Sequence, residues 1–257
     1  MLNGIKAALP PKLKGQLREI LDRIKVPGYS SAPVRQAFVS YIVNGSGPAL
    51  WSMDHIKPYG VVEQGCYLPH FLLSRAFLRL HPVSSWCDLG TGVGSLPLAL
   101  MRLGLKEVIG IDGSDAALRQ GLVRVPSTNY GVGDLTEPLQ VCYSDGRHAH
   151  FEVVSALELL EHVPEDKIAS LFDNMVRLNP VYLVLAIGLQ PDPPYHVNLK
   201  SMKEWILQLE QAFPSYLYDD ELSQRVFFGT KRHPRFQNDF HTNCFPENRN
   251  LVIFKRK

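Results

Sequence analysis

From residue 85 onward, short apolar segments alternate with segments in which apolar residues recur at helical spacing. The strand-like segments span 85–89, 107–112, 129–134, 151–157 and 181–187. The helix-like intervals span 95–103, 114–123, 164–178 and 201–213. This alternation predicts an α/β fold, in which a Rossmann-like and mostly parallel sheet carries helices on both faces. Two later strand-like segments, 215–220 and 250–256, predict an antiparallel hairpin at one edge and bring the sheet to seven strands.

The first 80 residues follow another pattern. Leucines and isoleucines at helical spacing predict a helix over 11–25 that packs one face on the main domain, and two more helices are predicted at 34–43 and 68–80. Residues 44–65 are rich in glycine, proline and aromatic residues, which predicts a loop that either closes over a ligand or simply connects the helices. The expected division is an N-terminal helical cap with a lid loop over 1–80 and a main domain over 81–257.

Composition narrows the class of protein. The chain has 257 residues, of which 45% are hydrophobic, and this argues for a globular protein rather than a disordered one. No apolar run is long enough to cross a bilayer, so we expect a cytoplasmic protein without a membrane partner. Its four cysteines form no C-x-x-C pair, which disfavours a thiol-rich zinc site. The net charge of +2 does not by itself indicate nucleic acid, although basic residues cluster near the N-terminus and in 230–235.

The stretch DLGTGVGS, which begins at Asp88, places Gly90, Gly92 and Gly94 directly after the first predicted strand. A dinucleotide fingerprint requires a third glycine where this chain has Ser95. The spacing D-x-G-x-G-x-G instead resembles motif I of the class I S-adenosylmethionine (SAM)-dependent methyltransferases. The resemblance implies that the glycine turn lies against the methionine and sugar parts of SAM, while Asp88 orients the turn or the ammonium group of the cofactor.

Further matches to this family follow in the expected order along the chain. Asp112 ends the second predicted strand, where the resemblance implies that its carboxylate accepts hydrogen bonds from both ribose hydroxyls. Asp134 follows the third strand and is implied to accept from the adenine amino group, with Leu135 beside the ring. The ordered set is more specific than any one motif, and SAM is the expected cofactor.

After the fourth predicted strand, the chain reads ELLEHV, with Glu158, Glu161 and His162, and His196 follows the fifth strand. The E-x-x-E-H pattern with a later histidine resembles the metal site of small-RNA 2′-O-methyltransferases, and a similar segment occurs in ubiquinone-pathway O-methyltransferases. Carboxylates and imidazoles together suit a divalent ion that binds and acidifies a hydroxyl. Two catalytic hypotheses remain: a metal held by Glu158, Glu161, His162 and His196, or His162 as the base. Glu158 often faces the cofactor in relatives.

These features predict a methyl-transferring enzyme of the transferase class that acts on a hydroxyl of a small or medium polar molecule. A methyltransferase acting on RNA or DNA is the first alternative, and a catalytically inactive partner protein with the SAM fold is the second. The tetrad DPPY, residues 192–195, occurs in amino-methyltransferases of DNA bases. Those enzymes place it after the fourth strand, whereas here it follows the fifth, so we interpret it as a turn.

Overall fold

The computed structural model describes residues 34, 38–45, 47, 59–114, 116, 117, 119, 125–189, 196–231 and 250–257, with backbone only for 59–66 and 231. Its strands are β1 (Tyr41–Asn44), β2 (Ser85–Leu89), β3 (Glu107–Asp112), β4 (Tyr130–Val132), β5 (Gln140–Tyr143), β6 (Val153–Leu157), β7 (Tyr182–Ala186), β8 (Tyr216–Tyr218) and β9 (Leu251–Arg256). Its α-helices are α3 (Tyr59–Leu80), α4 (Ser95–Arg102), α6 (Ile168–Arg177), α7 (Met202–Ala212) and α8 (Asp220–Lys231), and short 3-10 turns are η1 (Ser127–Asn129), η2 (Leu160–His162) and η3 (Glu165–Lys167).

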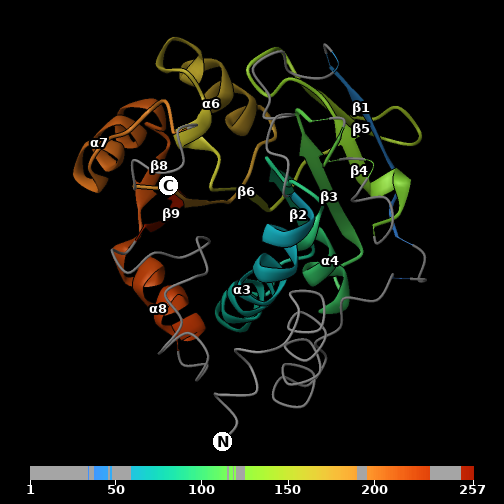
Figure 1. Ribbon diagram of the computed structural model, residues 1–257, viewed down its shortest axis with the longest axis horizontal. Helices are drawn as coiled ribbons and strands as arrows, with labels where there is room; N and C mark the ends of the chain where they lie inside the picture. Colours follow the sequence, from blue (N-terminus) through green and yellow to red (C-terminus); the bar gives the residue numbers. More distant parts are fainter. Residues whose placement is uncertain are drawn as a thin grey trace, which may run out of the picture.

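Seven strands form one sheet in the order β4-β3-β2-β6-β7-β9-β8 (Figure 1). The first five of these are parallel to one another, and β9 runs antiparallel to both of its neighbours, β7 and β8. The predicted α/β Rossmann-like sheet is therefore confirmed. From β2 the chain adds strands toward one edge of the sheet, and from β6 it adds strands toward the other edge. The boundary between β2 and β6 is therefore a topological switch point, where α/β sheets bind ligands.

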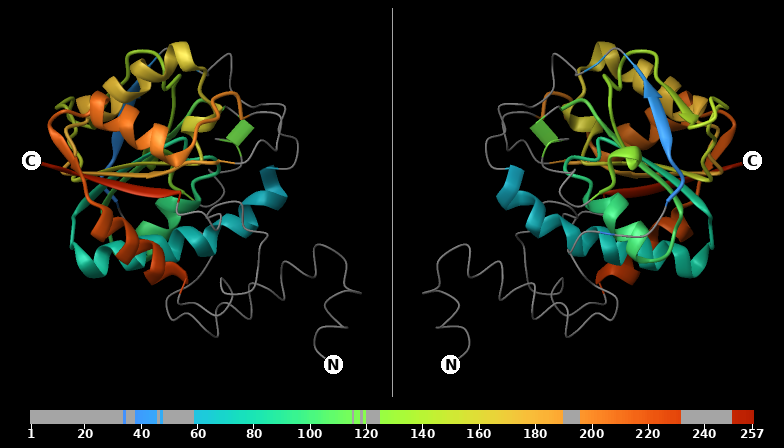
Figure 2. Two further views of the ribbon diagram at one scale, coloured as in Figure 1. Left: turned by 90° about the vertical axis from the view of Figure 1, so that its left-hand side faces the viewer. Right: turned by 90° about the vertical axis from the view of Figure 1, so that its right-hand side faces the viewer.

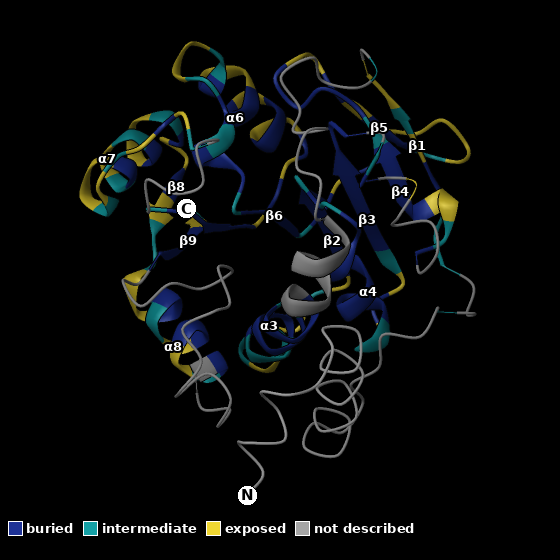
Figure 3. Cartoon of the chain, viewed as in Figure 1, coloured by how far each residue is buried: buried dark blue, intermediate teal, exposed yellow. Residues whose placement is uncertain are grey.

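Helices cover both faces of this sheet (Figure 2). The views show α6 and α7 on one face and α3, α4 and α8 on the other. Side chains of a strand alternate between the two faces, so Tyr182 and Val184 pack with the α3 layer, while Leu183 and Leu185 pack with the α6 layer. The central strands are buried on both sides, and their ribbons are dark blue in Figure 3.

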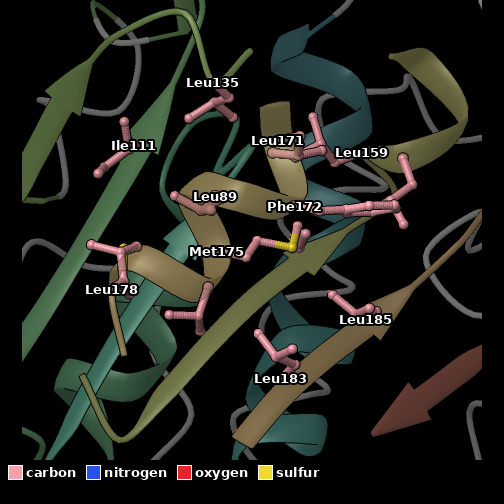
Figure 4. Packing of buried hydrophobic residues seen from close by; sticks show 14 of the residues in the cluster. Leu89, Ile111, Leu135, Leu159, Leu171, Phe172, Met175, Leu178, Leu183 and Leu185 are labelled. Carbon is pink, nitrogen blue, oxygen red and sulfur yellow. The ribbon is translucent and has the colours of Figure 1, made fainter. Parts of the chain in front are cut away.

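The α6 layer shows how the helices are held. Leu171, Phe172 and Met175 project from one side of α6 toward the leucines of the strands (Figure 4). All three side chains are at most 4% exposed. Burying side chains of this size contributes roughly 1.5–3 kcal/mol each relative to leaving them in water. The apolar stripe of α6 therefore fixes the helix on the sheet and leaves its opposite side to solvent.

Three local predictions were wrong. The segment predicted as a helix over 34–43 contains a strand, β1, which pairs antiparallel with β5, a strand that the pattern did not indicate. Helix α3 begins at Tyr59 rather than at 68, so it includes part of the predicted loop over 44–65 and has Pro69 inside it. The irregular stretch expected between the last two strands begins with α8.

Other predictions were confirmed or stay open. Strands β8 and β9 are antiparallel neighbours, as expected, although β9 lies inside the sheet and β8 forms its edge. The helix predicted over 11–25 and most of the one over 114–123 lie outside the described residues. The cap over 1–80 stays a prediction, and α3 packs against α4 and α8 of the main layer. Within the described residues, no helix combines the length and apolarity needed to cross a membrane.

The pairing of β1 depends on a glycine in β4. A Cβ atom at Gly131 would lie 2.4 Å from Cγ2 of Val43, far inside contact distance. We expect Gly131→Ala to lower the free energy of unfolding by about 1–3 kcal/mol, the range for an overpacked site. Adding Val43→Ala should restore part of this loss, because it removes the two methyl groups of Val43 and leaves only its Cβ, 2.9 Å away. Urea unfolding of the two single variants and the double variant measures the coupling, and equal losses in Gly131→Ala and the double variant would contradict the contact.

Candidate functional site

A glycine turn joins β2 to α4 at the carboxyl edge of the sheet. Gly90, Gly92 and Gly94 have φ angles of 72°, 55° and 73°, a left-handed conformation that side chains disfavour. A Cβ at Gly90 would lie 2.9 Å from the side chain of Leu159, and one at Gly94 would lie 2.8 Å from Val125. Both conformation and space therefore require glycine, and the turn presents bare backbone at this edge.

Asp112, the last residue of β3, connects the glycine turn to the next loop. Its Oδ2 accepts a hydrogen bond from the backbone N–H of Gly92 at 2.7 Å, and its Oδ1 accepts one from the N–H of Ser114 at 2.8 Å. The side chain is nearly buried, with Asp112 8% exposed. The structure thus places this predicted residue against the glycine turn, where it also holds the turn in position.

Asp88 lies beneath the turn rather than on its surface. Its Oδ1 accepts a hydrogen bond from the hydroxyl of Ser155 on β6 at 2.6 Å, and Trp86 Nε1 donates to the same hydroxyl oxygen at 2.8 Å. Burial raises the pKa of Asp88 to about 7, and the nearby hydroxyls of Ser155 and Thr91 offset part of this rise. Sequence reasoning missed Ser155, since only the pairing of β2 with β6 brings it to Asp88.

Asp134 and Leu135 begin the loop after β4. Asp134 Oδ1 accepts from the backbone N–H of Thr136 at 2.9 Å and from its hydroxyl at 2.7 Å, which makes a tight turn. Leu135 is 1% exposed and belongs to the core beneath α6, where Figure 4 labels it. Asn174 of α6 donates from Nδ2 to the Leu135 carbonyl at 2.8 Å. This asparagine supports the loop and was not predicted, because nothing local marks it.

Of the four residues predicted to converge after β6 and β7, Glu161, His162 and His196 lie together, and Glu158 lies beside Glu161. Glu161, His162 and His196 each offer one potential metal-ligand atom, and these three atoms all lie within 4.8 Å of one another. The ring centroids of His162 and His196 are 4.7 Å apart, and the angle between the ring planes is 74°. Glu158 interacts with Glu161 through its carboxyl group. We call these four residues the carboxylate–histidine cluster.

Glu161 is the most unusual member of the carboxylate–histidine cluster. It is 0% exposed, and neither carboxylate oxygen has a hydrogen-bond partner of normal geometry. Burial raises its pKa to about 7, with the backbone amides of Glu161 and Gly188 offsetting part of the rise. Burial, followed by the charge of Glu161, also raises the pKa of Glu158 well above its ordinary value. A buried carboxylate with such poor hydrogen bonds is unfavourable unless a proton or a cation accompanies it.

Two residues that the sequence did not indicate shape this cluster. A Cβ at Gly188, two residues after β7, would lie 2.5 Å from Glu161 Oε1 and 2.9 Å from His196 Cε1, so a side chain there would displace both groups. Asn250 is fully buried before β9 and donates from Nδ2 to Glu158 Oε1 at 3.0 Å. Glu158 itself has a φ of 54°, an unfavourable backbone conformation for a residue with a side chain.

Most of the chain is similar to a known protein family. Residues 63–226 match the methyltransferase domain family. The chain belongs to the methyltransferase domain family. No curated protein sequence matches the chain.

Solved methyltransferase structures share the fold. The plantazolicin methyltransferase BpumL, in complex with SAH, aligns with a TM-score of 0.53 at 13% identity over 80% of this chain and 93% of that one. A TehB-like SAM-dependent methyltransferase from Corynebacterium glutamicum has a TM-score of 0.49 at 13% identity over 72% of this chain and 88% of that one. The small RNA methyltransferase HEN1 has a TM-score of 0.49 at 14% identity over 72% of this chain and 25% of that one. The predicted class I SAM-dependent methyltransferase fold is confirmed, whereas the specific likeness of the E-x-x-E-H segment stays a prediction.

The burial of Asp88 in this methyltransferase domain predicts a pH-dependent stability. Its pKa is about 7 in the folded protein and near 3.8 when unfolded, so the folded state holds the proton more tightly. The folded state is therefore favoured at low pH and loses this contribution as pH rises from about 4 to 7. Asp88→Asn stays neutral, and we expect its melting temperature relative to wild type to rise between pH 5 and pH 7 and then level off.

Thermal unfolding from pH 5 to pH 8 measures this difference. Asp145→Asn is the matched control, because Asp145 is exposed and its pKa is lowered by hydrogen bonds from Arg147. The control should show no such rise. A melting-temperature difference for Asp88→Asn that does not change with pH would show that Asp88 is ionised in the folded protein at every pH tested.

Proposed function

We propose that this chain is a SAM-dependent methyltransferase that methylates a hydroxyl of a small or medium polar substrate, with the carboxylate–histidine cluster activating that hydroxyl. The proposal combines the family of the chain with the two features of its carboxyl edge. These are the glycine turn, which suits the cofactor, and the cluster beside it, which suits the acceptor. We expect the protein to act in the cytoplasm.

The residues around the glycine turn fit SAM. Positions 90 and 94 exclude side chains, which leaves backbone free to lie against a ligand. Asp112 offers two acceptor oxygens for the ribose hydroxyls, Asp134 offers acceptors for the adenine amino group, and Asp88 backs the turn near the methionine end. Because Leu135 is buried, we assign it to supporting the adenine side of the site from below. When bound, SAM supplies an electrophilic methyl group on a sulfonium.

The observation that carries the hydroxyl assignment is the buried carboxylate of Glu161. Its two oxygens lack hydrogen bonds of normal geometry, and the nearby imidazoles of His162 and His196 complete a set that suits a divalent cation. A divalent ion held by Glu158, Glu161, His162 and His196 would acidify a bound hydroxyl. In the version without a metal, His162 accepts the proton.

The reaction balances with these groups. The hydroxyl oxygen forms a new C–O bond to the methyl carbon while the S–CH₃ bond breaks and its electron pair stays on sulfur. The hydroxyl proton leaves to a base, and His162 is the imidazole we assign to this task. The protein contributes mainly the placement of the two reactants, since in-line attack on a sulfonium methyl depends on their orientation.

Metal binding tests the cluster directly. We expect the wild-type protein to bind Mn²⁺ in a titration followed by electron paramagnetic resonance. Glu161→Gln should weaken binding at least tenfold, since it removes a charged ligand. Glu165→Gln is the matched control, because Glu165 pairs with Lys200 outside the cluster, and it should bind like wild type. Equal binding by all three proteins would remove the metal hypothesis.

Methyl transfer then separates the two versions of catalysis. With a metal as the activating group, a chelator abolishes product formation and added Mn²⁺ restores it. With His162 as the base, His162→Ala abolishes it in the presence of chelator or without it. Methyl transfer that survives both changes would show that the cluster does not activate the hydroxyl.

Binding of S-adenosylhomocysteine tests the cofactor assignment and the alternative of an inactive partner protein. We expect calorimetry to show binding by wild type and at least tenfold weaker binding by Asp112→Ala, because the carboxylate serves both the ligand and the turn. Asp145→Ala removes an exposed carboxylate that follows β5 and pairs with Arg147, and it should bind like wild type. A folded wild-type protein that does not bind would favour the inactive partner.

A further inference from the structure

Asn250 connects two strands that are not neighbours in the sheet. Strand β7 lies between β6 and β9 (Figure 1). Leu157 at the end of β6 pairs with Ala186 at the end of β7, and Ala186 pairs in turn with Leu251 at the start of β9. Glu158 and Asn250 therefore each lie one residue beyond the same row of the sheet, at its carboxyl edge.

The contact between these two side chains crosses β7. Two strand spacings, roughly 10 Å, separate β6 from β9, so only a long side chain can bridge them. Glu158 has such a side chain, and its Oε1 accepts a hydrogen bond from Asn250 Nδ2 at 3.0 Å. The backbone N–H of Glu158 donates to the Ala186 carbonyl at 2.7 Å. The Asn250 carbonyl accepts from the N–H of Ile187 at 3.1 Å. Both ends of the contact are therefore fixed on β7.

The contact holds a residue whose backbone is unfavourable. Glu158 has a φ of 54°, in the left-handed region, where a residue with a side chain stays only if its surroundings hold it there. Its carboxyl group lies between Asn250 on one side and Glu161 on the other. The side chain of Glu158 is thus directed toward the other members of the carboxylate–histidine cluster by a donor that lies outside the cluster.

The amide of Asn250 is only half satisfied. Asn250 is fully buried, and its Oδ1 has no hydrogen-bond partner in the described part of the chain. An apolar residue of similar shape would serve packing at less cost, because a buried polar atom without a partner is unfavourable. The donor Nδ2 is therefore the group that this position requires, and its acceptor is Glu158.

We propose that Asn250 is a positioning residue, which directs the carboxylate of Glu158 toward the divalent cation proposed for the carboxylate–histidine cluster. The inference rests on the metal-dependent version of the proposed function, and it adds a residue that acts through Glu158 rather than on the ion. Groups that hydrogen-bond to metal ligands orient those ligands, and their loss typically weakens metal binding about 10- to 100-fold. An amide suits this task, because it donates to one oxygen of the carboxylate and leaves the other oxygen for the ion.

Two other roles for Asn250 lead to different results. If Asn250 only fills space before β9, its loss lowers the stability of the fold and leaves the affinity for metal unchanged. If its Oδ1 binds the cation directly, its loss weakens metal binding whether or not residue 158 is a carboxylate. The dependence on Glu158 therefore distinguishes positioning from both.

The experiment is a Mn²⁺ titration of the full chain, followed by electron paramagnetic resonance and arranged as a double-mutant cycle. Asn250→Leu removes the amide and keeps a similar shape, and it should bind Mn²⁺ at least tenfold more weakly than wild type. Glu158→Gln should also bind at least tenfold more weakly. The double variant should bind within about twofold of Glu158→Gln, because Asn250 has no further effect once the carboxylate is gone.

The spectrum of the bound ion gives a second readout. At saturating Mn²⁺, the spectra of Asn250→Leu and Glu158→Gln should resemble each other and differ from that of wild type, because the ion has lost the same ligand in both. A residue that only stabilised the fold would not produce this likeness.

Asn129→Leu is the matched control. Asn129 is also fully buried, and its Nδ2 donates to the backbone carbonyls of Val39 and Val108, both at 2.7 Å, rather than to a member of the cluster. This variant should lose stability and bind Mn²⁺ like wild type. Thermal unfolding shows that each variant is folded, and Asn250→Ala replaces Asn250→Leu if the latter does not fold.

The outcomes separate this inference from the proposed function. A loss of affinity in Asn250→Leu that is absent when Glu158→Gln is already present supports it. Wild-type affinity in Asn250→Leu, an equal loss in Asn129→Leu, or losses that multiply in the double variant overturn it and leave the metal hypothesis standing. A folded wild-type protein that binds no Mn²⁺ overturns it together with the metal-dependent version, and binding of S-adenosylhomocysteine then decides the cofactor assignment by itself.

Discussion

The position of β2 between β3 and β6 is the constraint on which the whole site depends. The parallel register places Asp88 beside Gly110 on one side and Ser155 on the other. Because the three strands point the same way, the glycine turn, Asp112 and Glu158 all emerge at one edge. The hydrogen bonds from Trp86 to Ser155 and from Ser155 to Asp88 hold this register beneath the turn. A slip between these strands would separate the glycine turn from the carboxylate–histidine cluster.

Several residues near the carboxyl edge of the sheet have energetically unfavourable conformations or environments, and the buried core offsets their cost. Glu158 has a left-handed backbone, Glu161 has a buried carboxylate without hydrogen bonds of normal geometry, and Asp88 has a pKa raised to about 7 by burial. Each would destabilise an isolated structure, but the strands that carry them are buried on both faces by two helical layers. Such local strain is typical of functional sites, since a rigid scaffold can hold groups where a ligand or ion needs them.

Helix α8 extends the helical layer around α3 without disturbing the carboxyl edge of the sheet. It lies between β8 and β9 in the chain, and Leu222, Val226 and Phe227 attach it to the core shared with α3. Its other side carries Arg225 and Phe228 to the solvent. An element inserted at this side of the sheet leaves the carboxyl edge intact.

The sequence by itself determined the parts of the molecule that depend on local patterns. Apolar runs marked the five parallel strands, and the glycine spacing with Asp112 and Asp134 marked the residues at the carboxyl edge, because turn conformation and strand burial are properties of neighbouring residues. The convergence of Glu161, His162 and His196 could also be predicted from the sequence, because parallel strands bring their carboxyl ends to one edge of the sheet. Tertiary structure alone decided the pairing of β1 with β5, the helix α8, and the support from Asn174 and Asn250. Each of these depends on contacts between residues far apart in the chain, whose energy no local pattern records.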